Sequence, residues 1–398
     1  MNIGMVHLDL AVESGDPRMF YSIAQGIRKR GHTVTVYTDR FDANCFPDLH
    51  RGLRVTVTDA PPASRAVTKD TGFLNAVLAR YLKNRLQDEG VARIGKLLPP
   101  NLDLLVCQNN RSYKLGVMYK KKNPKARVVW IMNNAPFYYE RKSNIVMTWG
   151  SAMMAALEKH HVQQALPGID LIVVHDEERR MLGASLGKPT LLIPIPVDFD
   201  GFYQPVKTRA SSDRRVTFLD MGSLSPARKF EDIIRAAAVL RDRGYDARVL
   251  LACKDVWRND AYKQFLLALV RDTHMEDRVT FYFDGVSESE LRALQRTADF
   301  FVFPNHIVIW SMASFEAMAA GLPLLISRVT SVTRPLHDGK EALFFDPGNI
   351  EQIADCAEAL IRHPDRYKEV AEAGQRFVKK NLSWESYIER FLAAAIGK

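Results

Sequence analysis

The stretch RVTFYFDGVSESELRALQRTADFFVFPN, residues 278–305, decides the fold class. Each end is a short apolar run rich in β-branched and aromatic residues, which is typical of a buried strand. Between the two runs, residues 288–298 show apolar side chains at helical spacing. A strand, a helix and a second strand in this order predict part of a parallel sheet that is covered by helices.

The same alternation of strands and helices continues along the rest of the chain. In the first half we expect strands at 1–10, 32–38, 53–59, 102–108, 126–132 and 170–176, and helices at 18–29, 72–98 and 149–166. In the second half we expect further strands at 215–222 and 247–253 and further helices at 230–243 and 261–272. Residues 188–215 carry four prolines and then a polar run, which predicts a linker.

We therefore predict an α/β fold of two Rossmann-like, doubly wound domains that face a cleft. The N-terminal domain would span residues 1–200 and the C-terminal domain residues 201–382, with a last helix at 383–398 packing back on the first domain. In such sheets, ligands bind beyond the carboxyl ends of the strands.

The composition is that of an ordinary soluble globular protein, with 47% hydrophobic and 25% charged residues in a chain of 398. Its four cysteines form no CxxC pair, which argues against a zinc ribbon and a disulfide framework. The N-terminus has no basic region of a signal peptide, and no apolar run is long enough to span a membrane, so we expect a cytoplasmic protein. The chain has no GxGxxG motif, which argues against a nucleotide-dependent oxidoreductase.

The net charge of +9 indicates an anionic partner but does not name it. Phosphorylated small molecules and an acidic membrane surface are two options, and solvated Lys and Arg side chains that keep the protein soluble are a third. Nucleic acid is not expected, because the basic residues are scattered and no aromatic-interleaved module appears.

Two strand-to-helix turns carry candidate binding residues. In the turn from Asp9 to Arg18, Gly15 would let the backbone approach a ligand, although a glycine in a turn is often only a turn residue. In the turn MGSLSPARKF, Arg228 and Lys229 stand at the start of a helix, where cations oppose the helix dipole. Either an anion binds between them or they are a solvated pair.

A third turn lies in NHIVIWSMASFEAMAAGLPLLIS, residues 305–327. Residues 312–320 predict a short helix of small residues that contains a single acid, Glu316. A buried carboxylate needs a partner, which a hydroxyl-rich ligand or a structural Arg or Lys could supply.

These segments resemble the GT-B glycosyltransferases, specifically the large retaining family that includes sucrose synthases and many mannosyl- and glucosyltransferases (glycosyl transferases group 1). Residues 278–305, FEAMAAGLPLLIS and DGKEALFFDPGNIEQIADCAEAL are similar to the C-terminal half of that family. MGSLSPARKFEDIIRAAAVL resembles its GRLxxxKG motif, and SGDPRMFYSIAQGIRKRGHTVTVYT has the spacing of its GGxER…RGHxVxV segment.

The resemblance implies a nucleotide-diphosphate sugar held mainly by the C-terminal domain, and a hexose transferred with retention to a glycan or lipid-linked acceptor. It implies catalytic roles for Arg228 and Lys229 at the diphosphate and for Glu316 at the ribose. The implied donor contacts are Gly15, Gly222, Ser223, Tyr282, Asp284, Val308, Ser311, Met312 and Ala313. Asn133 or Asn134 takes the place of a histidine near the transferred sugar.

Two departures from the family pattern keep an alternative open. The first acid of the family's acidic pair is replaced by Val308, and the arginine of its GRL motif is replaced by Ser223. The alternative is a non-catalytic nucleotide-sugar-binding protein on the same scaffold. No DxD-like acidic pair ends a strand, so we expect neither a metal nor another cofactor.

The N-terminal half also has features suited to the inner face of a membrane and to polysaccharide biosynthesis on a lipid-linked acceptor. These are FYYERK at 137–142 and two basic clusters, at 28–30 and at 120–122, beside a helix that carries Trp149, Met153, Met154 and Leu157. A core helix and solvated lysines would explain the same residues.

Overall fold

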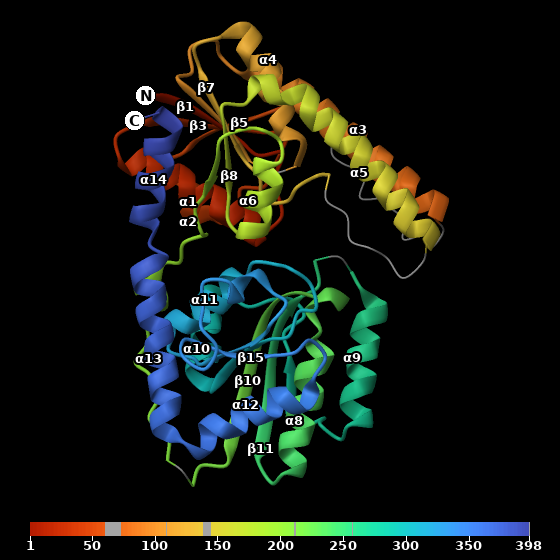
Figure 1. Ribbon diagram of the computed structural model, residues 1–398, viewed down its shortest axis with the longest axis vertical. Coiled ribbons are helices and arrows are strands. Elements are labelled where there is room, and N and C mark those ends of the chain that lie inside the picture. Colours follow the sequence, from red (N-terminus) through yellow and green to blue (C-terminus); the bar gives the residue numbers. More distant parts are fainter. Residues whose placement is uncertain (60–72, 109, 138–144, 211, 257, 398) are drawn as a thin grey trace. The chain divides into compact units, whose positions relative to one another are not determined.

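The computed structural model describes the whole chain except residues 60–72, 109, 138–144, 211, 257 and 398 (Figure 1). The chain divides into two compact units. The first unit comprises Met1–Ile195 and Glu385–Lys398, and the second comprises Pro196–Trp384. The sequence placed the change of domain at residue 200 and the return of the chain at residue 383.

The first unit contains a seven-stranded sheet in the order β5-β3-β1-β6-β7-β8-β9, with all neighbouring strands parallel. The strands are β1 (Asn2–Val6), β3 (Thr33–Thr38), β5 (Arg54–Val57), β6 (Leu104–Gln108), β7 (Arg127–Ile131), β8 (Leu171–Val174) and β9 (Thr190–Leu192). A separate two-stranded ribbon joins β2 (Asp9–Leu10) and β4 (Arg40–Phe41). The central strands are almost entirely buried, as expected for a sheet covered on both faces.

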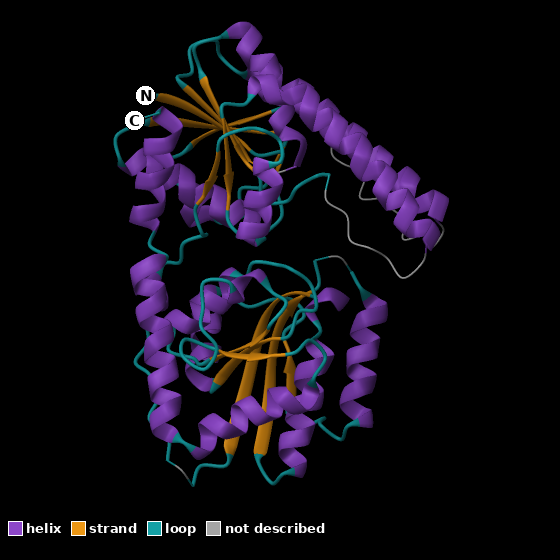
Figure 2. Ribbon diagram, in the orientation of Figure 1, coloured by secondary structure: helices purple, strands orange, loops and turns teal. Residues whose placement is uncertain are grey.

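Helices lie on both sides of this sheet (Figure 2). They are α1 (Gly15–Lys29), α2 (Pro47–His50), α3 (Phe73–Leu97), α4 (Leu115–Lys122), α5 (Ile145–Ala165), α6 (Glu177–Ala184) and α14 (Trp384–Ile396). Short 3-10 turns precede α4 at Asn110–Lys114 and follow α5 at Leu166–Gly168.

The second unit contains a six-stranded parallel sheet in the order β12-β11-β10-β13-β14-β15. The strands are β10 (Arg215–Ser223), β11 (Asp246–Lys254), β12 (Val279–Phe281), β13 (Phe300–Phe303), β14 (Leu324–Ser327) and β15 (Leu343–Phe345). The helices are α7 (Phe199–Phe202), α8 (Phe230–Asp242), α9 (Asp260–Asp272), α10 (Glu288–Thr297), α11 (Met312–Ala319), α12 (Ile350–Arg362) and α13 (Pro364–Asn381). The α/β class with doubly wound parallel sheets is confirmed.

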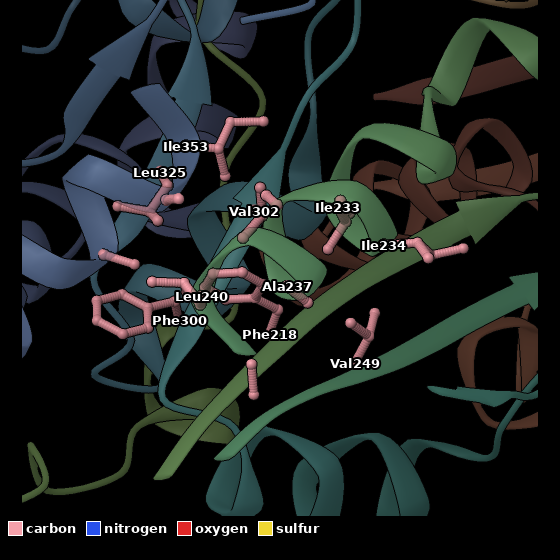
Figure 3. Packing of buried hydrophobic residues seen from close by; sticks show 14 of the residues in the cluster. Phe218, Ile233, Ile234, Ala237, Leu240, Val249, Phe300, Val302, Leu325 and Ile353 are labelled. Carbon is pink, nitrogen blue, oxygen red and sulfur yellow. The ribbon is translucent and has the colours of Figure 1, made fainter. Parts of the chain in front are cut away.

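The core of the second unit joins α8 to the sheet. Figure 3 shows side chains of α8 beside those of β10, β11 and β13. In this core, Ile233, Ala237 and Leu240 lie at helical spacing on α8 and are fully buried. The apolar stripe of α8 therefore fixes the start of the helix close to the end of β10, where the candidate site lies.

Three predicted elements differ from the structure. The segment 188–215 is not only a linker, because Thr190–Leu192 pair with β8 as a seventh strand and Phe199–Phe202 form a helical turn. The expected strand at 1–10 is broken after Val6, because Asp9 and Leu10 pair with Arg40 and Phe41 instead. Helix α5 begins at Ile145, earlier than the predicted residue 149.

Helix α14 packs on α1 through a glycine. A Cβ atom on Gly26 would lie 2.6 Å from Cγ1 of Ile388, which is closer than real Cβ atoms approach another heavy atom. The absence of a side chain at Gly26 thus lets the last helix of the chain pack on the first.

We expect G26A to lower the free energy of unfolding of the protein by about 1–3 kcal/mol, because it overpacks this contact. In an I388A background the obstructing atoms are gone, and the same change should be neutral or stabilising, since Ala favours a helix over Gly by roughly 1 kcal/mol. Urea unfolding of the four proteins of this cycle measures the difference. Equal destabilisation by G26A in both backgrounds would contradict the assigned contact.

Candidate functional site

The site of the second unit lies at the carboxyl ends of β10 and β13. These two strands are neighbours, and the sheet grows outward from them in opposite directions. The loops that follow them therefore diverge, which is the arrangement that binds ligands in open α/β sheets. The residues concerned are 224–229 after β10 and 304–311 after β13.

Buried polar atoms without a hydrogen-bond partner gather at this edge. Among the described residues of the second unit, most such side-chain atoms belong to residues at the carboxyl ends of β10, β13 and β14 or in the segments that follow them. They are Asp220 Oδ2, Arg228 Nη1, Asn305 Oδ1, Trp310 Nε1, Ser314 Oγ, Ser327 Oγ and Ser331 Oγ. Because native proteins pair nearly all buried polar groups, this concentration indicates a place where a polar ligand binds.

Arg228 is the central cation of the site. It ends the 3-10 turn Pro226–Arg228, and its guanidinium lies 5.4 Å from the centre of the Phe303 ring. A Cβ on Gly222 would lie 2.5 Å from Nη2 of Arg228, so a larger residue at this position would displace the guanidinium from the end of β10. Burial lowers the pKa of Arg228 from its ordinary value, although the nearby Asp220 opposes that effect.

Lys229 is the residue that turns the chain into α8. Its φ of 59° places it in the left-handed region, which is costly for a residue other than glycine. Its Nζ lies 3.4 Å from Glu231 Oε1. The two cations predicted at this helix start are therefore present, with Arg228 turned toward the end of β10 and Lys229 paired within its own turn.

Asp220 was not singled out from the sequence, although it is an acid within the apolar strand RVTFLDMG. It is fully buried in β10, and its Oδ1 accepts a hydrogen bond of 2.7 Å from the backbone N–H of Met221. Burial raises the pKa of Asp220 to about 7, against the opposing influence of Arg228 and of this hydrogen bond. A carboxyl group that titrates near neutrality thus stands beside the central cation.

Helix α11 begins at the same edge. Its N-cap is Ser311, whose Oγ accepts a hydrogen bond of 3.1 Å from the backbone N–H of Ser314. Met312 and Ala313 form the first turn, so their backbone N–H groups belong to the helix start that attracts anions. Glu316 lies one turn further on and is 2% exposed.

Val308 lies in the loop between β13 and α11 and is 37% exposed. Two residues earlier, His306 Nε2 makes a hydrogen bond of 2.8 Å to Oδ2 of the buried Asp232, in the first turn of α8. Burial raises the pKa of Asp232, and the hydrogen bond from His306 lowers it in part. The two members of this pair are 74 residues apart, so no local sequence pattern links them.

Tyr282 and Asp284 lie in the turn after β12, which is two strands away from β10 in the sheet. The backbone N–H of Tyr282 donates to Leu251 O at 2.9 Å, and Asp284 is exposed. The predicted donor residues of the second unit therefore lie along one edge, with Gly222, Ser223 and Arg228 in its middle and the β12 turn toward its end.

The remaining predicted residues belong to the first unit. Gly15 opens α1 after β1, and Asn133 and Asn134 follow β7, so all three lie at the carboxyl edge of the seven-stranded sheet. Next to Gly15, the carboxylate of Asp16 accepts hydrogen bonds from Gln108 Nε2 at 2.9 Å and from Asn133 Nδ2. His7 Nε2 lies 3.1 Å from its Oδ2. No sequence motif singled out Asp16, His7 or Gln108.

The features proposed for a membrane surface are only partly described. Residues 138–142 lie outside the described residues, as does the side chain of Trp149. Within the basic cluster 120–122, Lys120 pairs with Asp170 at 2.9 Å and Lys122 donates to the Gly95 carbonyl at 2.7 Å. Met153 and Leu157 on α5 are 56% and 49% exposed. Among the described residues, no helix combines the length and the apolar character needed to cross a bilayer.

Residues 206–377 match the model of the family "Glycosyl transferases group 1". Among curated proteins, the chain is 25% identical over 202 residues to mannosylfructose-phosphate synthase of Agrobacterium fabrum, which covers 50% of the chain and 44% of that protein. It is 31% identical over 179 residues to D-inositol 3-phosphate glycosyltransferase of Pseudarthrobacter chlorophenolicus, or 44% of the chain and 42% of that protein. The matches thus span less than half the length of these relatives.

Solved structures resemble the chain over nearly its whole length. Sucrose-phosphate synthase of Thermosynechococcus elongatus aligns with a TM-score of 0.74 at 17% identity, over 99% of this chain and 98% of that one. Anabaena HepE, solved in complex with UDP and glucose, aligns with a TM-score of 0.72 at 14% identity, over 100% and 99% of the two chains. The resemblance to group 1 glycosyl transferases is confirmed for the second unit, and the GT-B fold is confirmed for the whole chain.

We expect Asp220 to make stability depend on pH. The folded protein holds a proton on this group up to a pH of about 7, whereas the unfolded chain loses it near 3.8, so the free energy of unfolding falls as pH rises through this range. In D220N this dependence is absent, and the variant should gain roughly 2–4 kcal/mol relative to the wild type between pH 4 and 8.

Urea unfolding of wild type and D220N at several pH values measures this difference. D242N, which changes an exposed acid at the end of α8, serves as the control and should follow the wild type. Parallel curves for D220N and wild type would show that Asp220 does not titrate in this range.

Proposed function

We propose that this protein, whose residues 206–377 match the group 1 glycosyl transferase model, moves a hexose from a nucleotide-diphosphate sugar to a glycan or lipid-linked acceptor with retention of configuration. The observation that carries this proposal is the partly buried guanidinium of Arg228, whose buried Nη1 has no hydrogen-bond partner and which passes over Gly222 at the diverging loops of β10 and β13. A doubly negative diphosphate is the ligand that such a site suits.

The diphosphate would lie between Arg228, Lys229 and the start of α11. Negative charge grows on the leaving diphosphate as the bond to the sugar breaks, and fixed positive groups stabilise that charge. Arg228 offers an unused donor, and the first N–H groups of α11 after Ser311 supply oriented dipoles. We propose that these groups act without a divalent ion. Among the described residues, no three His, Cys, Asp or Glu side chains are grouped to hold one.

The rest of the donor would extend along the same edge. A buried carboxylate such as Glu316 has lone pairs that can accept hydrogen bonds from ribose hydroxyls. The turn of Tyr282 and Asp284 would hold the base. The HepE structures contain UDP, glucose and UDP-glucose, which makes UDP-glucose the first donor to test on this chain.

Val308 gives a reason to test turnover separately from binding. An apolar residue there cannot accept hydrogen bonds from sugar hydroxyls, as an acid would. His306, two residues before Val308 and anchored by Asp232, offers a polar group that could contact the sugar instead. Donor binding without transfer to any acceptor would favour a non-catalytic sugar-binding protein.

We expect R228Q to weaken UDP binding by about ten- to a hundredfold, since a hydrogen bond to a charged group contributes roughly 1.5–3 kcal/mol. E316Q should weaken it to a similar extent. Isothermal titration with UDP and UDP-glucose, with and without EDTA, measures both effects. R376Q, an exposed change on α13, is the control.

Three results would contradict this assignment. UDP affinity unchanged in R228Q would remove the arginine from the site. A sharp fall in the melting temperature of E316Q with intact UDP affinity would make Glu316 structural. Loss of binding upon chelation would show that a divalent ion takes part.

We further propose that α3 and α5 bring the protein to the surface of an anionic membrane. The two helices lie side by side (Figure 1), and both expose apolar side chains. These are Tyr81, Leu82 and Leu86 on α3 and Met153 and Leu157 on α5. Apolar residues exposed together in this way mark interaction surfaces more often than single ones do.

Flotation with vesicles that contain an anionic lipid tests this surface. We expect the wild type to float and the double variant M153Q/L157Q to float several-fold less, because the apolar contact with the bilayer is lost. The variant A156Q, which changes a neighbouring exposed residue of α5, should float like the wild type. A wild type that stays at the bottom of the gradient at low and at moderate salt would disprove membrane binding.

A further inference from the structure

The loop between β13 and α11 exposes an apolar surface at the carboxyl edge of the second unit's sheet. Val308, at the middle of this loop, is 37% exposed. Its neighbours in the loop are also apolar and partly exposed, namely Ile307, Ile309 and Trp310. Exposed apolar side chains that follow one another at an edge where ligands bind indicate contact with an apolar part of a ligand.

This loop is held in place at both of its ends. At the first end, His306 Nε2 makes a hydrogen bond of 2.8 Å to Oδ2 of the buried Asp232. At the second end, Ser311 caps the start of α11, and the Trp310 ring lies 4.9 Å from the ring of the buried Phe315. The residues between these anchors are therefore presented in a fixed position, as a preorganised binding surface requires.

The polar side chains of the loop are committed elsewhere or buried. Asn305 and Ser311 are 1% and 5% exposed, and His306 is bound to Asp232. The side chains at and beside Val308 consequently offer carbon to a ligand. A sugar hydroxyl that faced them would lose its hydrogen bonds to water without gaining one from these side chains, which is unfavourable.

The position of this loop in the sheet places it at the sugar end of the proposed donor. Arg228, proposed to bind the diphosphate, lies 5.4 Å from the ring centre of Phe303, the last residue of β13. Val308 thus lies between that cation and the start of α11. The turn of Tyr282, proposed to hold the base, lies on the opposite side of β10, beyond β11. With the base there and the diphosphate at β10, the sugar extends toward the loop after β13.

We propose that the sugar of the donor carries a methyl group that contacts Val308, either the methyl of a 6-deoxy hexose or the acetyl methyl of an N-acetylated hexosamine. This inference rests on the proposed function, because it names the sugar class of the proposed donor. Val308 would be a specificity-determining residue, and His306 at the edge of the surface can still bond one hydroxyl. Because an apolar surface rejects an added hydroxyl by no more than about a hundredfold, glucose should bind weakly.

The experiment first selects the nucleotide and then compares sugars on it. UDP, GDP and dTDP are titrated into the full-length protein by calorimetry, and the tightest of them carries the sugars. Glucose is compared with 6-deoxyglucose and with N-acetylglucosamine, and mannose with 6-deoxymannose. We expect the wild type to bind at least one methyl-bearing donor about tenfold or more tightly than its hydroxylated counterpart. The comparisons distinguish a deoxy-sugar methyl from an acetyl methyl.

V308T tests the residue, because threonine has the shape of valine with a hydroxyl in place of one methyl. This variant should reduce the preference for the methyl-bearing donor several-fold while its affinity for the nucleotide alone changes little. A merely structural effect would weaken all donors alike and leave the preference unchanged. V57T makes the same substitution at a 42% exposed valine of β5, in the first unit, and should keep the preference of the wild type.

Equal or tighter binding of the hydroxylated donor in every comparison would overturn this inference and leave the proposed donor site standing, since the nucleotide is still bound. A preference that persists unchanged in V308T would also overturn it, because another residue would then select the sugar. A wild type that binds none of the three nucleotides would disprove the proposed donor site and, with it, the sugar assigned here.

Discussion

Parallel strand pairing is the constraint on which the rest of this structure depends. In both large sheets every neighbouring pair of strands is parallel, so every strand ends at the same edge of its sheet. A parallel connection needs a crossover, usually a helix, and each crossover starts at that edge. Polar residues that are far apart in the chain, such as Asp232 and His306, therefore meet there without any special local structure.

The two edges carry opposite charge at their centres. In the second unit the central group is the guanidinium of Arg228, which Gly222 allows to cross the end of β10. In the first unit it is the carboxylate of Asp16, which His7, Gln108 and Asn133 hold in its ionised form. A cationic edge suits the diphosphate of the proposed donor.

Asp220 adds a further property to the donor edge. A buried carboxyl whose pKa lies at about 7 changes between its neutral and its charged form when the pH changes slightly around neutrality. This group stands beside the cation proposed to bind the diphosphate. The charge that Arg228 presents to a ligand is thus partly offset above neutral pH and fully expressed below it. Glu316 and the start of α11 lie at the same edge. A polar ligand bound there could form hydrogen bonds with its polar groups.

The sequence by itself determined most helices and strands, and the strand ends at which ligand-binding residues are expected. The period of apolar residues predicted α8, α9 and α10 to within a residue or two, because local burial of one face fixes both the pattern and the helix. Glu316 and Arg228 stood out since each departs from what its element favours. Only the tertiary structure decided which polar side chains meet. Asp16 is joined to Gln108 and Asn133 across 92 and 117 residues, and β9 became a strand because β8 offered an unpaired edge. Such contacts follow from strand order and register, which no local pattern encodes.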